Sequence, residues 1–195
     1  MQFTKVILFT LLLSLSSIVQ AQEKENKDGG IGIKGGYNLS SIRNADGDET
    51  NHRSGFHLGF YGESFINNRI SIQPELLYSQ QGYKVETDTY KLTQKVNYLN
   101  VPVMLKVYPV NGFYLEFGPQ IGYAISHKEE FESFLGTSSR DFTPNSFNWG
   151  ANAGLGFKTN DGFSVGARYH YGLGEINDET SYFNNVLQLY VGFEF

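Results

Sequence analysis

The chain has 195 residues, with 15 Lys plus Arg against 20 Asp plus Glu and a formal net charge of −5. That length suits a single domain, and the acidic balance excludes a chain built to hold nucleic acid. Cysteine is absent, which excludes disulfides, thiolate catalysis and cysteine-type zinc sites. The 15% of aromatic residues and the 22 glycines, against a typical glycine share of about 7%, favour β-structure over helices.

The N-terminus has the pattern of a secretory signal peptide. Lys5 precedes an apolar run from Val6 to Leu13, and the segment ends in Val19-Gln20-Ala21, a small-residue cleavage pattern. A membrane anchor is the alternative, but the apolar run is shorter than the roughly 20 residues that a spanning helix needs. We therefore expect a signal peptide over residues 1–21, cleaved after Ala21, and a short lead-in over residues 22–29.

Residues 30–195 are expected to form one β-domain, because apolar and polar residues alternate in segment after segment. Eight alternating segments occur: Ile31–Leu39, Phe56–Phe60, Ile70–Tyr78, Leu99–Val107, Phe113–Ile125, Phe147–Phe157, Phe163–Leu173 and Leu187–Phe195. The connections between them are short and long in turn. Asn67-Asn68, Val110-Asn111-Gly112 and Asn160-Asp161-Gly162 predict tight turns, and long loops are expected over residues 41–53, 82–95, 127–145 and 174–185. This order predicts an eight-stranded antiparallel up-and-down transmembrane β-barrel, with both termini and the short turns on one side of the membrane.

The residues between the apolar positions indicate which face is the interior. Many of these positions are glycine, which weakens an exposed strand but leaves room in the crowded interior of a small barrel. Eight positions are charged, with four of each sign: Lys34, Lys106, Lys158, Arg168, Glu63, Glu75, Glu116 and Glu194. A balanced set of charges is what a filled, self-neutralising interior needs. A soluble β-sandwich, the alternative, does not explain this pattern.

Within the lumen we expect a charge network of Lys34, Glu75, Lys106, Glu116 and Arg168. One contact follows from turn length: if Val110-Asn111-Gly112 is a three-residue loop, Lys106 lies opposite Glu116. The network is expected to hold the barrel closed, and a gated path through it is the alternative. Eight strands leave an interior just wide enough for side chains, which argues against a general diffusion pore.

Two other patterns are candidate sites of chemistry. The acidic string Asn44–Glu49 loosely resembles a calcium loop but lacks the glycine at its sixth place and the distal Glu, so a solvated loop is expected. Ser126-His127 is the nearest approach to a nucleophile and base, but neighbouring strand residues point to opposite faces. The sequence therefore predicts no catalytic residue, metal site or cofactor.

Several motifs resemble the PorT-like outer-membrane β-barrel family over essentially the whole chain after the signal peptide. They are Gly32-Ile33-Lys34-Gly35-Gly36-Tyr37-Asn38-Leu39-Ser40, Ile72-Gln73-Pro74-Glu75-Leu76-Leu77-Tyr78-Ser79-Gln80-Gln81-Gly82, Tyr98-Leu99-Asn100-Val101-Pro102-Val103-Met104-Leu105-Lys106-Val107-Tyr108 and Gly118-Pro119-Gln120-Ile121-Gly122-Tyr123. The resemblance implies an outer-membrane barrel of a Gram-negative bacterium. It defines no catalytic or ligand residues, and the namesake's link to protein secretion implies at most an accessory role there.

The C-terminal residues Leu187, Leu189, Val191, Phe193 and Phe195 resemble the signal by which the barrel assembly machinery recognises its substrates. The expected partners are thus that machinery, outer-membrane lipid and an envelope or secretion protein bound through the loops, without nucleic acid. A narrow channel and a lipid-modifying enzyme, the latter using His127, are the alternatives to this non-enzymatic role. Pro74, Pro102 and Pro119 fall inside expected strands, where we expect local bulges.

Overall fold

The computed structural model describes residues 29–43, 51–86, 90–133, 136–140, 147–177 and 180–195. The expected signal peptide and most of the lead-in, and the acidic string Asn44–Glu49, lie outside these residues. Within the described part of the chain, no helix is long and apolar enough to cross a membrane.

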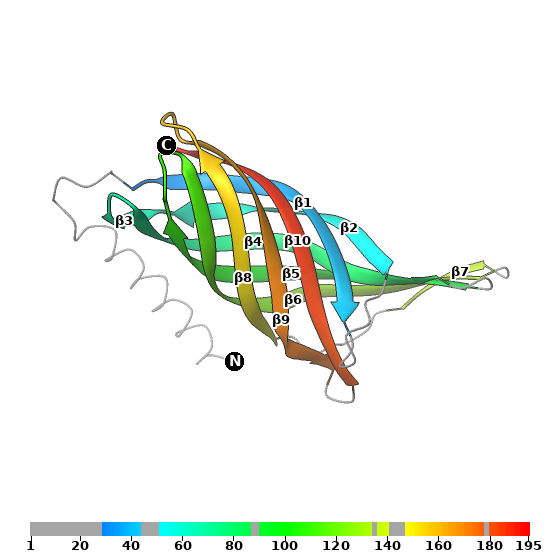
Figure 1. Ribbon diagram of the computed structural model, residues 1–195. Coiled ribbons are helices and arrows are strands. Elements are labelled where there is room, and N and C mark those ends of the chain that lie inside the picture. Colours follow the sequence, from blue (N-terminus) through cyan, green and yellow to red (C-terminus); the bar gives the residue numbers. More distant parts are fainter. Residues whose placement is uncertain (1–28, 44–50, 87–89, 134–135, 141–146, 178–179) are drawn as a thin grey trace, which may run out of the picture.

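The described residues form one antiparallel sheet that closes on itself (Figure 1). Its strands are β1 (Ile31–Arg43), β2 (Asn51–Gly62), β3 (Ser64–Asn67), β4 (Ile70–Glu86), β5 (Tyr90–Val107), β6 (Phe113–Ser133), β7 (Gly136–Arg140), β8 (Phe147–Lys158), β9 (Phe163–Asn177) and β10 (Thr180–Glu194). The order is β2-β1-β10-β9-β8-β6-β5-β4-β3, and pairing of β2 with β4 closes the ring. β2 and β3 follow one another along the same neighbour, β4, and so form one strand of the wall. β7 pairs with β6 outside the ring. The wall therefore has the eight strands that the sequence predicts.

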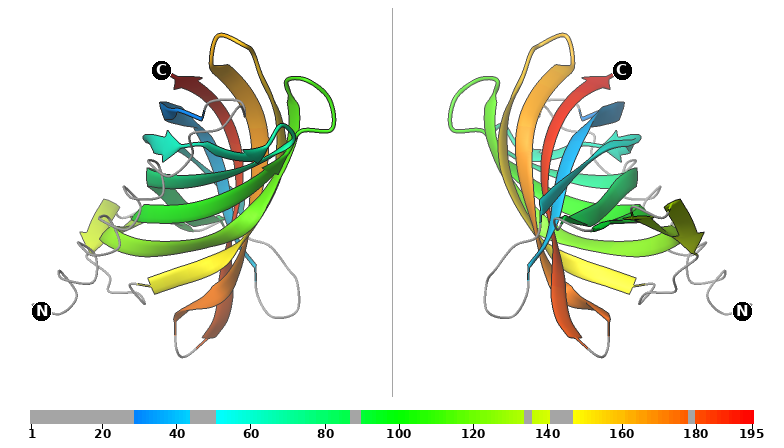
Figure 2. Two further views of the ribbon diagram at one scale, coloured as in Figure 1. Left: turned by 90° about the vertical axis from the view of Figure 1, so that its left-hand side faces the viewer. Right: turned by 90° about the vertical axis from the view of Figure 1, so that its right-hand side faces the viewer.

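The alternation of apolar and polar residues sorts the side chains as expected. Apolar side chains on the outer wall are exposed to the surroundings, for example Phe60, Leu155 and Val191, whereas the alternate positions are buried inside. The start of β1 and the C-terminus meet at one end of the barrel, where the Phe195 amide donates to the Ile31 carbonyl oxygen at 3.0 Å. We call this the short-turn end and the opposite one the long-connection end. Figure 2 shows the barrel from two further sides.

Where the structure describes the expected long loops, their residues are strand, which corrects the sequence interpretation. β4 and β5 stay paired out to Glu86 and Lys91, and β5 and β6 out to Tyr90 and Ser133. β7 adds a further strand to this extension along β6. Apolar alternation marks only the part of a strand that has an apolar face, so the sequence pattern stops where the ladder of hydrogen bonds continues.

The expected bulges at Pro74, Pro102 and Pro119 are absent, because the register on either side of each proline is the same. Pro74 lies beside the break between β2 and β3 on the neighbouring strand. The proline nitrogen has no hydrogen to donate, and the structure accommodates it by an interruption of pairing instead of by a shift. The one irregularity between β5 and β6 lies elsewhere, between Asn97 and Tyr98.

Candidate functional site: a lumen closed by two ion-pair clusters

Four of the five residues of the expected charge network meet in the middle of the lumen. Arg168 on β9 donates to both oxygens of Glu116, from Nε at 2.8 Å and from Nη2 at 2.9 Å. The same guanidinium donates to both oxygens of Glu75, from Nη1 at 2.8 Å and from Nη2 at 2.7 Å. Lys34 donates to Glu75 Oε1 at 2.9 Å. These residues, Lys34, Glu75, Glu116 and Arg168, form the central cluster.

The central cluster has two positive and two negative charges, and every one of its side chains is buried. Burial of a charge costs free energy unless it is paired and hydrogen-bonded. The planar guanidinium of Arg168 meets this condition with two carboxylates at once, because its fork matches the geometry of carboxylate oxygens. The cluster is therefore neutral and fills its level of the lumen.

Lys106, the fifth expected residue, lies in a second cluster nearer the short-turn end. It stands opposite Glu116 in the register of β5 and β6, as the turn length predicts, but its ammonium lies 3.8 Å from Glu63. Lys158 donates to Glu63 and to Glu194, both at 2.8 Å. We call Glu63, Lys106, Lys158 and Glu194 the rim cluster, and it too has two charges of each sign.

Glu63 is the residue whose importance the sequence did not predict. It sits between β2 and β3 and accepts hydrogen bonds from Ser71 and Tyr108, each at 2.6 Å, besides the one from Lys158. Burial raises the pKa of the Tyr108 phenol, and the Glu63 carboxylate raises it further, so Tyr108 stays protonated and remains a donor. The alternation of apolar and polar residues predicts that Glu63 faces inward. The break between β2 and β3, which directs the Glu63 carboxylate toward Tyr108, has no signal in the sequence.

Tyrosines separate the two clusters. The Tyr114 and Tyr190 hydroxyls are 2.9 Å apart, and Tyr190 donates to Glu116 Oε1 at 2.9 Å. Both rings need space: a Cβ built on Gly156 would lie 2.5 Å from the Tyr114 ring, and one on Gly166 would lie 2.5 Å from that of Tyr190. These glycines are inside because larger residues would displace the tyrosines.

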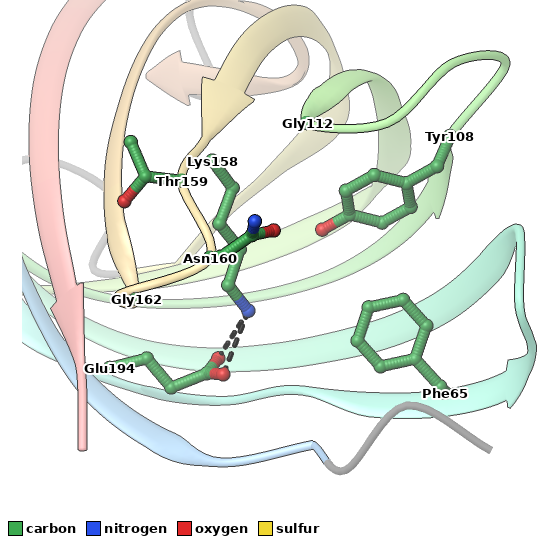
Figure 3. A pocket seen from close by; sticks show the side chains of 8 residues that line it. All are labelled: Phe65, Tyr108, Gly112, Lys158, Thr159, Asn160, Gly162 and Glu194. Atoms are coloured by element: carbon green, nitrogen blue, oxygen red, sulfur yellow. Dashed lines mark hydrogen bonds and ion pairs between the residues drawn. The ribbon is translucent and has the colours of Figure 1, made fainter.

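A pocket of about 220 Å³ opens at the short-turn end, next to the rim cluster (Figure 3). Lys158, Glu194, Phe65 and Tyr108 line it, with the tight turns at Gly112 and Gly162. In Figure 3 the Lys158 ammonium points to the Glu194 carboxylate. The two charged groups that a ligand in this pocket would contact are thus already paired with each other.

On the other side of the central cluster the lumen is rich in amides and imidazoles, and the buried Arg53 guanidinium there donates to the Gln81 carbonyl oxygen. We call Asn38, His57, Gln120, Asn152, His170 and Gln188 the amide–imidazole layer. His57 Nδ1 lies 2.7 Å from Asn38 Oδ1, and His170 Nδ1 lies 3.0 Å from Asn152 Oδ1. Asn38 Nδ2 donates to Ser79 Oγ and to two backbone carbonyl oxygens, so its Oδ1 accepts a hydrogen bond from His57 Nδ1. The Nε2 atoms of both histidines are buried without a described partner.

Neither alternative site of chemistry is assembled in the described residues. Ser126 and His127 are half-buried within β6, beside its register shift against β5, and no hydrogen bond between their side chains is found there. Among the same residues, no group of three or more His, Asp or Glu side chains could hold a metal ion. His52 lies exposed near the start of β2, away from the buried imidazoles.

A closed antiparallel barrel with an apolar outer wall and a filled polar interior defines the class of transmembrane β-barrels. The outer wall also has aromatic residues toward both ends, with Phe157, Phe163 and Phe193 near the short turns and Tyr123 and Trp149 toward the long connections, as interfacial girdles have.

The family model of the outer membrane protein beta-barrel domain matches residues 20–178. The chain belongs to this family of outer-membrane β-barrel proteins. A comparison with curated protein sequences found no significant match.

Solved outer-membrane barrels have a similar fold. One of them is the crystal structure of Ail, the attachment invasion locus protein of Yersinia pestis, in complex with the heparin analogue sucrose octasulfate. The Ail chain is 23% identical in sequence to this chain. It has a TM-score of 0.52 and covers 86% of this chain and 99% of that chain. Neisserial surface protein A is 14% identical with a TM-score of 0.51, covering 85% of this chain and 97% of that one. At these identities the likeness shows the fold.

Proposed function

We propose that this protein is a non-enzymatic outer-membrane barrel that binds an envelope or secretion partner through the strands that extend from its long-connection end. In the proposed orientation the termini and short turns are periplasmic and the long connections are extracellular, as in barrels with short periplasmic turns. The signal peptide cleaved after Ala21 would direct the chain to the periplasm.

The observation that carries this proposal is the extension of β4, β5 and β6 beyond the barrel wall. β5 and β6 stay paired as far as Tyr90 and Ser133, and β7 pairs with β6 from Glu129 to Arg140. Figure 1 shows β7 far from the C-terminus, at the tip of this extension. In the described part of the chain β7 has β6 as its one strand neighbour, so its other edge offers unpaired backbone groups, on which an extended segment of a partner can add a strand.

The contents of the lumen support a role at the surface over one in transport. The central cluster crosses the interior with paired charges, and the rim cluster repeats this arrangement at the short-turn end. A solute would have to displace buried ion pairs to pass, and each of them is costly to break. The barrel therefore supports recognition outside, with its interior serving stability.

The resemblance to PorT-like barrels favours a partner in the envelope or in protein secretion. Assembly of this barrel is proposed to begin with recognition of the C-terminal strand. Leu187, Leu189, Val191, Phe193 and Phe195 all lie on the outer face of the final strand segment, so one alternating apolar face is available to the barrel assembly machinery before the sheet closes.

The test is crosslinking on whole cells followed by purification from outer membranes in mild detergent. A matched variant replaces residues 129–140 by a two-residue turn, which removes β7 and its partner segment of β6 and leaves the wall intact. We expect a stoichiometric partner with the native chain and its loss with the variant, while heat-modifiable migration on gels shows that both are folded. Recovery of the native chain alone, or retention of the partner by the variant, would contradict the proposal.

A further inference from the structure

Arg43, the last residue of β1, is held against two aromatic rings. Its guanidinium carbon lies 4.4 Å from the centre of the Tyr171 ring and 4.8 Å from that of Phe183. Phe183 is the register partner of Arg43 on β10, and Tyr171 belongs to β9, one strand further. Stacking on aromatic faces is a preferred arrangement of the planar guanidinium, and it limits the orientations that this side chain can adopt.

This stacked group lies on the outer wall of the barrel, at its long-connection end. Along β1, Arg43 shares its face with the outward residues Tyr37 and Leu39, since alternate strand residues face the same way. Tyr171 also faces outward and is 41% exposed, and the neighbouring Leu173 is equally exposed. Arg43 therefore lies at the border of the apolar outer wall on the long-connection side, where a membrane-spanning barrel meets lipid headgroups.

Among the side chains that the structure describes, none forms an ion pair with this guanidinium. In the lumen, by comparison, Lys34, Lys106, Lys158 and Arg168 each have a carboxylate within 4 Å. Arg43 differs because its Nε atom is buried without a hydrogen-bond acceptor. An unmet buried donor of a charged group is costly, and an arginine offers five N–H groups in a fixed fork.

We propose that Arg43, stacked against Tyr171 and Phe183, binds the phosphate of an outer-leaflet lipid headgroup. The two rings hold the guanidinium plane, so that its N–H edge meets two phosphate oxygens in the bidentate arrangement that favours arginine over lysine. Its place beside the apolar wall selects an anion attached to a lipid, because the acyl chains can pack on the same face. This inference rests on the proposed orientation, in which the long-connection end faces outward.

The experiment is native mass spectrometry of the full-length purified chain released from nanodiscs, with lipid A as the probe. Three samples contain phosphorylated lipid A, enzymatically dephosphorylated lipid A, or phosphorylated lipid A with excess inorganic phosphate. We expect the native chain to retain the phosphorylated lipid and to lose about tenfold in affinity when Arg43→Gln removes the charged hydrogen bonds. Arg43→Lys should be intermediate, because it keeps the charge and loses the fork.

Arg69→Gln is the matched control, because Arg69 is exposed in the short turn between β3 and β4. It should retain lipid like the native chain. Equal retention by native chain and Arg43→Gln, or equal retention of the dephosphorylated lipid, would overturn the proposal. Displacement by inorganic phosphate alone would also overturn it, because it would make a free anion the ligand.

Orientation is tested separately, so that its failure is distinguishable from failure of the lipid site. The chain has no cysteine, and a single cysteine at position 138 on β7 should react with a membrane-impermeant maleimide on whole cells. Labelling without lipid retention would contradict the lipid site alone. Absence of labelling in intact cells, with labelling after the cells are opened, would contradict the orientation itself.

Discussion

Arg168 and Glu75 join opposite walls of the barrel. They belong to β9 and β4, which are four strands apart in a ring of eight, and two hydrogen bonds of 2.8 and 2.7 Å connect them. The contact spans 93 positions in sequence. It therefore fixes the cross-section of the barrel at this level in a way that no pairing between adjacent strands can.

Loss of Arg168 should destabilise the barrel strongly. Arg168→Met leaves Glu75 and Glu116 buried without their main counter-ion, and removing one side of a buried pair costs about 3–5 kcal/mol. The midpoint of urea unfolding in lipid vesicles measures the effect. Arg69→Met, at an exposed turn, should leave the midpoint unchanged. An equal midpoint for the two variants would show that the central cluster does not stabilise the fold.

Charge on the outer wall should be costly only within the apolar band. Val191 is 51% exposed on the outer face of β10 and Val110 is 63% exposed in a short turn. Val191→Arg should lower the free energy of unfolding by about 2–4 kcal/mol, because it places a cation in lipid. Val110→Arg should have little effect, because its side chain stays in water. The same unfolding assay compares them, and equal effects would place Val191 outside the membrane.

The two buried histidines should be neutral with the proton on Nδ1. Asn38 Oδ1 and Asn152 Oδ1 accept from His57 and His170 respectively, which selects this tautomer for both rings. Long-range ¹H–¹⁵N NMR of histidine-labelled protein in micelles reads the tautomer directly. A protonated Nε2 on His57 or His170 would contradict the arrangement of the amide–imidazole layer.

The two acids of the rim cluster should differ in importance. The Glu63 side chain is fully buried and accepts from Ser71, Tyr108 and Lys158, whereas that of Glu194 is 12% exposed and accepts from Lys158. Glu63→Ala leaves several buried donors without an acceptor, so it should lower the unfolding midpoint more than Glu194→Ala does. The reverse order would mean that the strand break at Glu63 is not held by these bonds.

The sequence predicted the features of this barrel that depend on alternation and turn length. The eight wall strands, the inward charges and the opposition of Lys106 and Glu116 all follow from these local rules. The division of the charges into two clusters does not, because it depends on which strands face each other across the closed ring. Arg168 and Glu75 have no sequence spacing that would pair them.

The prediction from the sequence was also wrong where the alternation of apolar and polar residues ends. The extension of β5 and β6 with β7 reads as polar loop, since neither face there needs to be apolar. Pro74 predicted a bulge because a proline breaks the ladder, but the break falls on the partner side, between β2 and β3. In each of these cases the tertiary contacts decided among conformations that local sequence allows.

Conductance of the purified chain in planar lipid bilayers tests the central claim most directly, namely that the lumen is closed and that recognition occurs outside it. We expect no steady conductance for the native chain, because the central and rim clusters fill the interior with paired charges. A steady, reproducible conductance that disappears when the chain is unfolded would contradict it.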